Sequence, residues 1–67
     1  MTPKKMEKII LEDGWYFVSS EGDHKHYKHR EKPGKVTIPF KNRPKDIKPK
    51  TLSLIFKQAL LNKKDYM

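Results

Sequence analysis

Apolar residues in the last third of the chain repeat at the spacing of one helical face. They follow the order i, i+3, i+4, i+7 and i+8 and are Leu52, Ile55, Phe56, Ala59 and Leu60. Pro49 precedes them and suits the first position of a helix, where its missing amide hydrogen costs nothing. A helix with such a stripe is stable only when another element covers the stripe. The chain therefore has to supply a covering surface from its remaining residues.

A second amphipathic helix is predicted over residues 3–13. Thr2 can cap the free amides and Pro3 favours the first turn. The apolar residues Met6, Ile9 and Ile10 then share one face, and Gly14 suits the left-handed conformation that ends a helix. Like the helix that begins at Pro49, this helix needs a surface that covers its apolar face.

Three short runs between the helices have strand character. They cover residues 15–20, 24–29 and 36–38, and turn-forming residues separate them at 21–23 and 30–35. Both apolar helical stripes are buried only if the two helices lie on one face of the sheet, which leaves the other face free. We therefore predict one α+β domain over residues 1–67, a three-stranded antiparallel αβββα fold like that of double-stranded-RNA-binding domains. Trp15, Phe17 and Tyr27 are expected in its core, and the alternative for Trp15 and Phe17 is stacking on nucleobases.

The formal net charge of +8 is concentrated in one part of the chain. Residues 22–50 carry ten lysines and arginines against three acidic residues, so +7 of the charge lies there, partly in a polar loop over residues 40–48. Such a patch favours a polyanion, because phosphate contacts release condensed counterions. The alternatives are a solvated lysine-rich surface or an acidic protein partner. The candidate RNA ligands are Lys25, Lys28, Lys35, Lys41, Arg43 and Lys45.

The chain has no cysteine, which excludes disulfides, a thiolate nucleophile and a Cys-ligated zinc ion. Its longest mostly apolar stretch, residues 52–61, is interrupted by polar residues and is far shorter than the roughly 20 residues that span a bilayer. The basic N-terminus is not followed by the apolar region of a signal peptide. We therefore expect a cytoplasmic protein without a membrane partner.

Three histidines fall within six residues of the second predicted strand. The strand period places His24, His26 and Lys28 on one face, and Lys25, Tyr27 and His29 on the other. Two imidazoles beside cations suit RNA cleavage, in which one group takes a proton and another gives one without a metal ion. The alternative is that they are only polar residues of an exposed strand.

Other roles for these residues remain open. A metal site is disfavoured because His29 faces away from the other two histidines and no carboxylate cluster completes the ligands. Asp23 and Glu21 are candidates to orient His24, although acids beside turns are more often caps. No other cofactor motif occurs, so we expect no cofactor.

Several short motifs, in this order and spacing, resemble the HicA family over almost the whole chain. They are Gly14-Trp15 after the first helix, residues 22–27 (Gly-Asp-His-Lys-His-Tyr), residues 36–39 (Val-Thr-Ile-Pro), and residues 48–52 (Lys-Pro-Lys-Thr-Leu) followed by Ile55 and Lys57-Gln58-Ala59. The resemblance implies an mRNA interferase, the toxin of a bacterial or phage type II toxin–antitoxin module, with a double-stranded-RNA-binding-domain-like fold and a HicB antitoxin partner. It also implies that His24 is the catalytic histidine and that Tyr27 is the aromatic residue that follows it.

The sequence departs from the family pattern at three places. Lys50 and Leu60 stand where the family often has glycine, so the last helix is expected to run on toward Asn62. Many members carry a second histidine after the third strand, whereas this chain has Phe40 and Lys41. The candidates to assist His24 are Lys41, which replaces that histidine as a phosphate ligand, and His26, which shares the strand face of His24 but is not part of the family pattern.

The leading hypothesis is a ribosome-independent, metal-independent endoribonuclease that cleaves mRNA with His24 and is neutralised by a HicB-like antitoxin. The alternative is a non-catalytic RNA-binding module, for which the fold and the charge suffice. A pure protein-interaction domain is a third interpretation, and it predicts little salt-dependent affinity for RNA.

Overall fold

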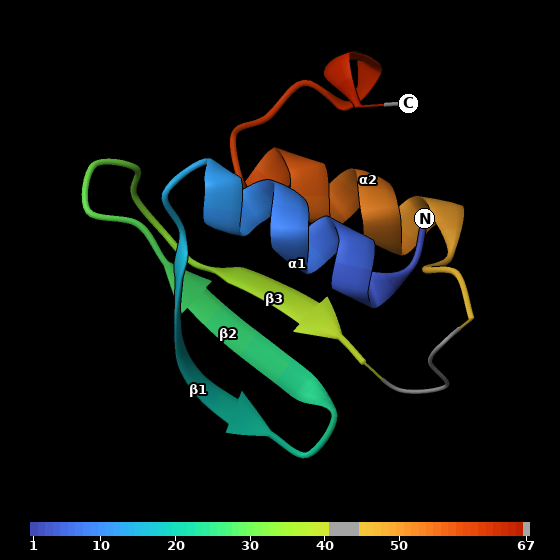
Figure 1. Cartoon of the computed structure of the whole chain (residues 1–67), viewed down its shortest axis with the longest axis horizontal. Helices are drawn as coiled ribbons and strands as arrows, with labels where there is room; N and C mark the ends of the chain where they lie inside the picture. The colour runs from blue at the N-terminus through green and yellow to red at the C-terminus, as the bar shows by residue number, and fades with distance from the viewer. Residues whose placement is uncertain (41–44, 67) are drawn as a thin grey trace.

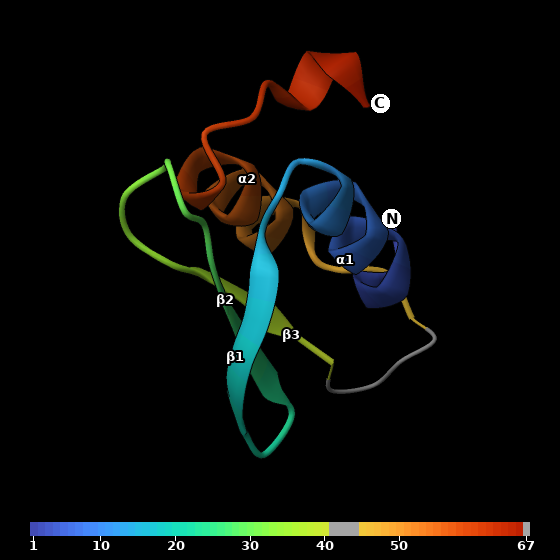
Figure 2. The same ribbon diagram turned by 60° about the vertical axis from the view of Figure 1, so that its left-hand side comes forward.

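Two helices of ten residues each cover one face of a three-stranded antiparallel sheet (Figures 1 and 2). The computed structural model describes residues 1–40 and 45–66. Along the chain the elements are α1 (Pro3–Glu12), β1 (Tyr16–Glu21), β2 (His24–Lys28), β3 (Val36–Pro39), α2 (Pro49–Gln58) and the 3-10 turn η1 (Lys63–Asp65). The predicted αβββα order and the placement of both helices on one sheet face are confirmed.

Helix α1 begins and ends at the signals that the sequence contains. The Thr2 side chain accepts a hydrogen bond from the Lys5 amide at 3.2 Å, and Pro3 occupies the first turn. Asp13 caps the C-terminus, and Gly14 follows with φ +105°. A residue with a Cβ is strained in that conformation, so the glycine fixes the abrupt change of direction into β1.

The sheet has the order β1-β2-β3, and the helices contact its β3 edge. All six residues of β1 are exposed because this strand is the edge that the helices do not reach. The prediction that Phe17 lies in the core is therefore wrong, because the residue is 51% exposed. Its ring packs edge-on against the Tyr27 ring, with the ring centroids 6.0 Å apart. Trp15 and Tyr27 are buried as expected.

Helix α2 stops earlier than the sequence suggested. It ends at Gln58, and Leu60 adopts the left-handed conformation with φ 56°, so the expected extension toward Asn62 is wrong. The Leu60 amide donates to the Lys57 carbonyl and the Leu61 amide to the Phe56 carbonyl, which is a Schellman motif. The stop turns Leu61 back against the core, where it is partly buried. Leu60 thus holds a glycine-like conformation without being a glycine.

The core lies between the helices and the sheet and is assembled from α1, α2, β2, β3 and residues that flank these elements. Its buried apolar residues are Met6, Ile10, Trp15, Tyr27, Val36, Ile38, Phe40, Ile47, Leu52, Ile55, Phe56 and Ala59. The Tyr27 hydroxyl donates a hydrogen bond to Glu7 of α1. Burial of the ring, together with the hydrogen bond and the negative charge of Glu7, raises the pKa of Tyr27 well above its usual value. Of the helices that the structure describes, none has the length and apolar character that crossing a membrane requires.

Candidate functional site

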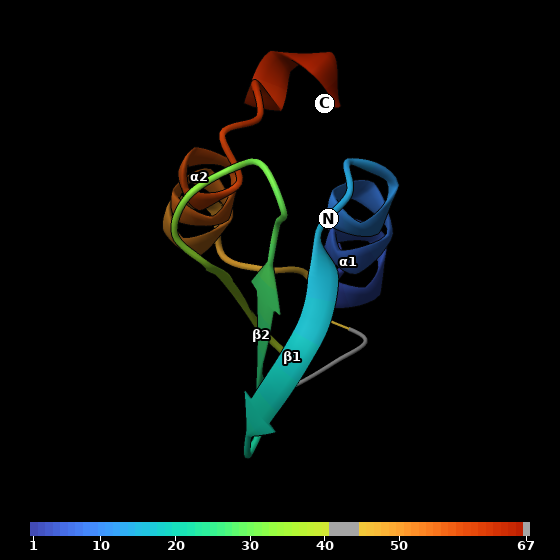
Figure 3. The same ribbon diagram turned by 90° about the vertical axis from the view of Figure 1, so that its left-hand side faces the viewer.

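The turn between β1 and β2 projects away from both helices, as the three views show (Figures 1, 2 and 3). Gly22 and Asp23 form this turn, so that Glu21 and His24 are the pair of residues that flank it across the two strands. Gly22 takes φ +57°, a conformation that favours glycine. The geometry places a carboxylate and an imidazole opposite each other at the turn end of the hairpin.

His24 lies exposed at this end of the sheet. Among the described residues its side chain forms no hydrogen bond and no ion pair. Because Tyr27 faces the helices, the alternation along β2 directs His24, His26 and Lys28 to the opposite, open face. That face is the one predicted for them. An exposed imidazole without intramolecular partners is able to exchange protons with a bound molecule.

His26 shares the face of His24 but is held firmly by its neighbours. Its Nε2 lies 3.1 Å from Glu21 Oε1, and its Nδ1 lies 2.9 Å from Thr37 Oγ1. An ionised carboxylate only accepts, so Nε2 donates to Glu21 and Nδ1 accepts the hydroxyl proton of Thr37 in the neutral ring. The sequence raised Glu21 as a partner of His24, whereas its hydrogen bond goes to His26. We call Glu21, His24, His26 and Thr37 the hairpin-tip cluster.

His29 lies beyond the other end of β2 and has a different environment. Its Nδ1 accepts hydrogen bonds from the backbone amides of Glu31 and Lys32 at 3.0 and 3.2 Å. Its Nε2 therefore carries the proton and donates to the Asp13 carbonyl at 2.8 Å. The ring also packs edge-on against Trp15, with centroids 5.2 Å apart. His29 thus ties the β2–β3 connection to the end of α1.

Lys32 strengthens the same junction. Its Nζ donates to Asp13 Oδ2 at 2.5 Å and to the Ala59 carbonyl at 3.2 Å, where α2 ends. Asp13 Oδ2 also accepts from Trp15 Nε1 at 3.2 Å. We call Asp13, Trp15, His29 and Lys32 the Asp13 cluster, since the aspartate connects its members. The ends of both helices and the β2–β3 connection meet there.

The predicted RNA ligands do not form one compact group. Lys28 shares the open face with His24, while Lys25 faces the helix side, where its Nζ lies 4.3 Å from the centre of the Phe40 ring. Lys35 is exposed just before β3, and Lys45 is exposed near Pro39, the cross-strand partner of His24. Lys41 and Arg43 lie outside the described residues.

Among residues 1–40 and 45–66 no three His, Asp or Glu side chains lie close enough together to hold a metal ion. The three histidines are divided between the two clusters, with His24 and His26 at the hairpin tip and His29 beside Asp13. The metal interpretation of the histidine spacing therefore finds no support in the described part of the chain.

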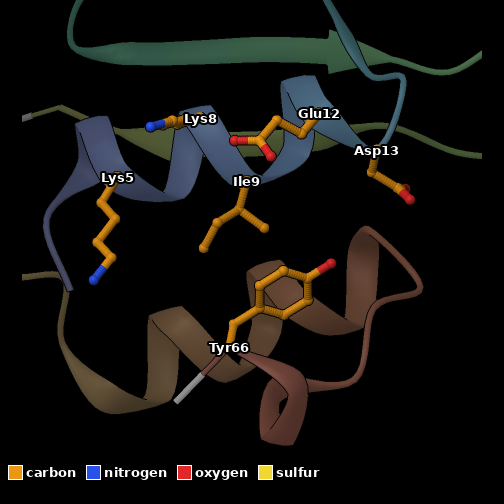
Figure 4. A pocket seen from close by; sticks show the side chains of 6 residues that line it. All are labelled: Lys5, Lys8, Ile9, Glu12, Asp13 and Tyr66. Atoms are coloured by element: carbon orange, nitrogen blue, oxygen red, sulfur yellow. The ribbon is translucent and has the colours of Figure 1, made fainter.

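A groove of about 480 Å³ lies on the helix side of the molecule, between α1 and the η1 turn (Figure 4). Tyr66 closes it from the η1 side, and α1 lines it with Lys5, Lys8 and Glu12. Both signs of charge meet in this groove, so it is not a dedicated anion site. It also lies across the fold from the face that carries His24.

The sequence raised Glu21 only as a group that orients His24, and its hydrogen bond to His26 was not identified, although a signal for the position of Glu21 exists. Gly22 and Asp23 form a two-residue hairpin turn, and such a turn pairs the residues on either side of it. Applied to residues 21 and 24, this rule pairs Glu21 with His24. The burial of His26 could not be read in the same way, because it depends on contacts across two strands.

The chain was compared with known protein families and with curated proteins. The model of a family described as the HicA toxin of bacterial toxin–antitoxin systems matches residues 3–61, which covers both helices and all three strands. The search of curated proteins found no match.

Proposed function

The chain belongs to the HicA toxin family of bacterial toxin–antitoxin systems, and from this premise we propose that it is an endoribonuclease that cleaves mRNA. His24 is its essential catalytic group. The observation that carries the proposal is the exposed His24 imidazole on the open sheet face, which has no hydrogen-bond or ion-pair partner among residues 1–40 and 45–66, with an oriented carboxylate on the residue opposite it. Cleavage takes place in the cytoplasm, does not depend on the ribosome, and stops translation.

The chemistry needs only what the RNA and the side chains supply. The 2′-hydroxyl attacks the adjacent phosphorus, its proton passes to a base, and an acid protonates the leaving 5′-oxygen. The nucleophile is part of the substrate, so the reaction does not require a metal ion to activate water. Histidine suits the acid or base role because both of its protonation states are available near neutral pH. His26 and Lys41 are the groups that the sequence offers to assist His24.

Basic side chains around the sheet bind the RNA backbone. Lys28 lies on the His24 face, Lys35 is exposed near one end of β2, and Lys45 is exposed near the other end. Lys25, Lys41 and Arg43 complete the proposed set. Contacts of this kind neutralise phosphates without reading sequence, so affinity should fall steeply as salt concentration rises.

A HicB-like antitoxin neutralises the protein by covering the open sheet face. An acidic partner fits this surface because the chain has a formal net charge of +8. Covering the hairpin tip keeps RNA away from His24 without any change in the fold of the toxin. Occlusion is therefore the mechanism of inhibition that we propose.

The test compares the purified wild-type chain with His24→Ala on a defined mRNA. We expect a loss of cleavage of at least about 100-fold, the lower end of what acid–base catalysis contributes, with RNA binding retained. Lys64→Ala, in the exposed η1 turn, is the control variant and should cleave normally. A folded wild-type chain that binds RNA with a steep salt dependence but leaves it intact would instead favour the RNA-binding module. A chain that does not bind RNA would favour a protein-interaction domain.

A further inference from the structure

Glu21 occupies the position directly opposite His24, the group on which the proposed chemistry depends. The two residues are cross-strand partners on β1 and β2, and both are exposed on the open face. The Cβ atoms of such a pair lie about 4.5–5.5 Å apart. Their functional groups can therefore approach the same phosphodiester from two sides, one toward the 2′-oxygen and one toward the 5′-oxygen.

The carboxylate of Glu21 is fixed although its side chain is 83% exposed. Oε1 accepts the hydrogen bond from His26 Nε2, and the His26 side chain is only 11% exposed. Thr37 of β3 fixes the other side of the ring at 2.9 Å. Among the described residues Oε2 has no hydrogen-bond partner, so one oxygen is anchored and the other is available.

The environment of His26 determines whether His26 or the Glu21 carboxylate can act on RNA. Both of its ring nitrogens already have partners within the protein, one on β1 and one on β3. A direct proton transfer by His26 would first have to break one of these hydrogen bonds. A polar contact to a carboxylate that is itself 83% exposed contributes little to stability, typically about 0–1 kcal/mol. The arrangement orients a carboxylate more effectively than it stabilises the fold.

We infer that Glu21 is the general base that completes catalysis with His24 as the general acid, and that His26 is a positioning residue that holds the Glu21 carboxylate. The inference rests on the proposed ribonuclease function. Glu21 takes the proton of the 2′-hydroxyl while the bond between the 2′-oxygen and phosphorus forms. The bond from phosphorus to the 5′-oxygen breaks, and protonated His24 gives its proton to that oxygen. The products are a 2′,3′-cyclic phosphate and a free 5′-hydroxyl.

Glu21→Gln separates this chemistry from a simple effect of charge. The amide still accepts a hydrogen bond from His26 but cannot take a proton, so cleavage should fall by roughly 10²–10⁴-fold. The substitution also removes a negative charge, so RNA binding should be unchanged or tighter. Glu31→Gln changes the charge equally at an exposed site outside the cluster and should cleave normally. Cleavage by Glu21→Gln within threefold of wild type would overturn the inference and leave the role of His24 intact.

A modified substrate distinguishes the acid from the base. An RNA with sulfur in place of the bridging 5′-oxygen has a leaving group that needs no protonation. We expect His24→Ala to cleave this substrate nearly as fast as the wild-type chain does, whereas Glu21→Gln stays slow. The reverse pattern, or rescue of both variants, would overturn the assignment of roles. A wild-type chain inactive on both substrates would overturn the proposed function and this inference with it.

The positioning role of His26 is tested by combining substitutions. His26→Leu should lower kcat with little change in KM, and His26→Gln should restore part of the rate because its amide can still donate to Glu21. If His26 acts through Glu21, adding His26→Leu to Glu21→Gln should cost no further activity. Additive losses would show that His26 acts independently of Glu21 and would overturn its positioning role.

Discussion

The two ends of β2 place histidines in opposite environments. At the hairpin-tip cluster, His24 is exposed and has no hydrogen-bond partner among the described residues. At the Asp13 cluster, both ring nitrogens of His29 bond to backbone groups and the ring packs on Trp15. One histidine is therefore available to a substrate, and the other is part of the fold. Neither residue type nor proximity in sequence separates these two roles.

The difference shows that one end of the sheet, where both helices end, holds hydrogen bonds that join distant parts of the chain. The Asp13 cluster joins the end of α1, the β2–β3 connection and the end of α2 through buried or half-buried hydrogen bonds. The hairpin tip contributes little to that junction and can vary its chemistry without loosening the core. Stability and function should accordingly respond to different substitutions.

The largest expected effect on stability comes from His29→Ala. It leaves the Asp13 carbonyl and two backbone amides without their partner, at a cost of about 2–3 kcal/mol. Each kcal/mol corresponds to about 4–8 °C in Tm for a domain of this size. His24→Ala should change stability by less than about 0.5 kcal/mol. Thermal unfolding followed by circular dichroism measures both variants, and equal losses would contradict the contrast between the two ends.

Gly14→Ala should destabilise the same end by a similar or slightly smaller amount. An added Cβ would lie 2.8 Å from His29 Nε2, and the φ of +105° strains any residue with a side chain. We expect a loss of about 2 kcal/mol, of which left-handed strain supplies roughly 1–2 kcal/mol.

The contact with His29 can be isolated in a double-mutant cycle. In a His29→Ala background the close contact is gone, so Gly14→Ala should cost less than it does in the wild-type chain. Urea unfolding of the four proteins gives the coupling energy, which should reach about 0.5 kcal/mol or more. Strict additivity would show that backbone strain alone explains the glycine.

The sequence was sufficient to predict the architecture, because helical periodicity, proline positions and turn residues acted together. Helix α1 is capped by Thr2, begins at Pro3 and ends just before Gly14, as predicted. The strand alternation placed His24, His26 and Lys28 on one face. These are local signals, which depend on a few neighbouring residues. They specify the elements and the face on which a side chain lies.

Features that depend on contacts between distant elements were not predictable in the same way. Phe17 has strand character, but whether it is buried depends on how far the helices reach across the sheet. The hydrogen bonds of His26 need the register of all three strands, and those of His29 need the junction around Asp13. The end of α2 was missed because the contact that stops it, Leu61 against the core, is tertiary.

Tyr27 is a buried residue of β2, between the hairpin-tip cluster and the Asp13 cluster. Its substitution measures how much a core hydrogen bond contributes to stability. Tyr27→Phe removes the hydrogen bond to Glu7 and should cost about 1 kcal/mol at neutral pH. Because folding raises the pKa of Tyr27, the unfolded chain loses this proton first, near the ordinary tyrosine pKa of about 10. This contribution to stability is complete below pH 10 and is lost as pH rises further.

The dependence of stability on alkaline pH tests this prediction, with Tyr16→Phe as the control variant. Urea unfolding between pH 8 and 11 should show wild type and Tyr27→Phe converging as the pH rises. Tyr16→Phe, at an exposed position on β1, should keep the alkaline loss of the wild-type chain. Parallel curves for wild type and Tyr27→Phe would contradict the raised pKa of Tyr27, which comes first from burial of the ring and then from Glu7.

The smallest effect is expected at Leu60, next to the Ala59 carbonyl that binds Lys32. Leu60 is 58% exposed and has φ 56°, so glycine relieves about 1–2 kcal/mol of left-handed strain. Glycine also increases the freedom of the unfolded chain, which offsets about 0.4–1 kcal/mol. Leu60→Gly should therefore stabilise the protein by about 0.5–1 kcal/mol. The matched control is Leu54→Gly, at a 53% exposed position inside α2, which should destabilise by about 1 kcal/mol. Opposite signs in urea unfolding would show that the Schellman turn, and not the loss of an exposed leucine, determines the result.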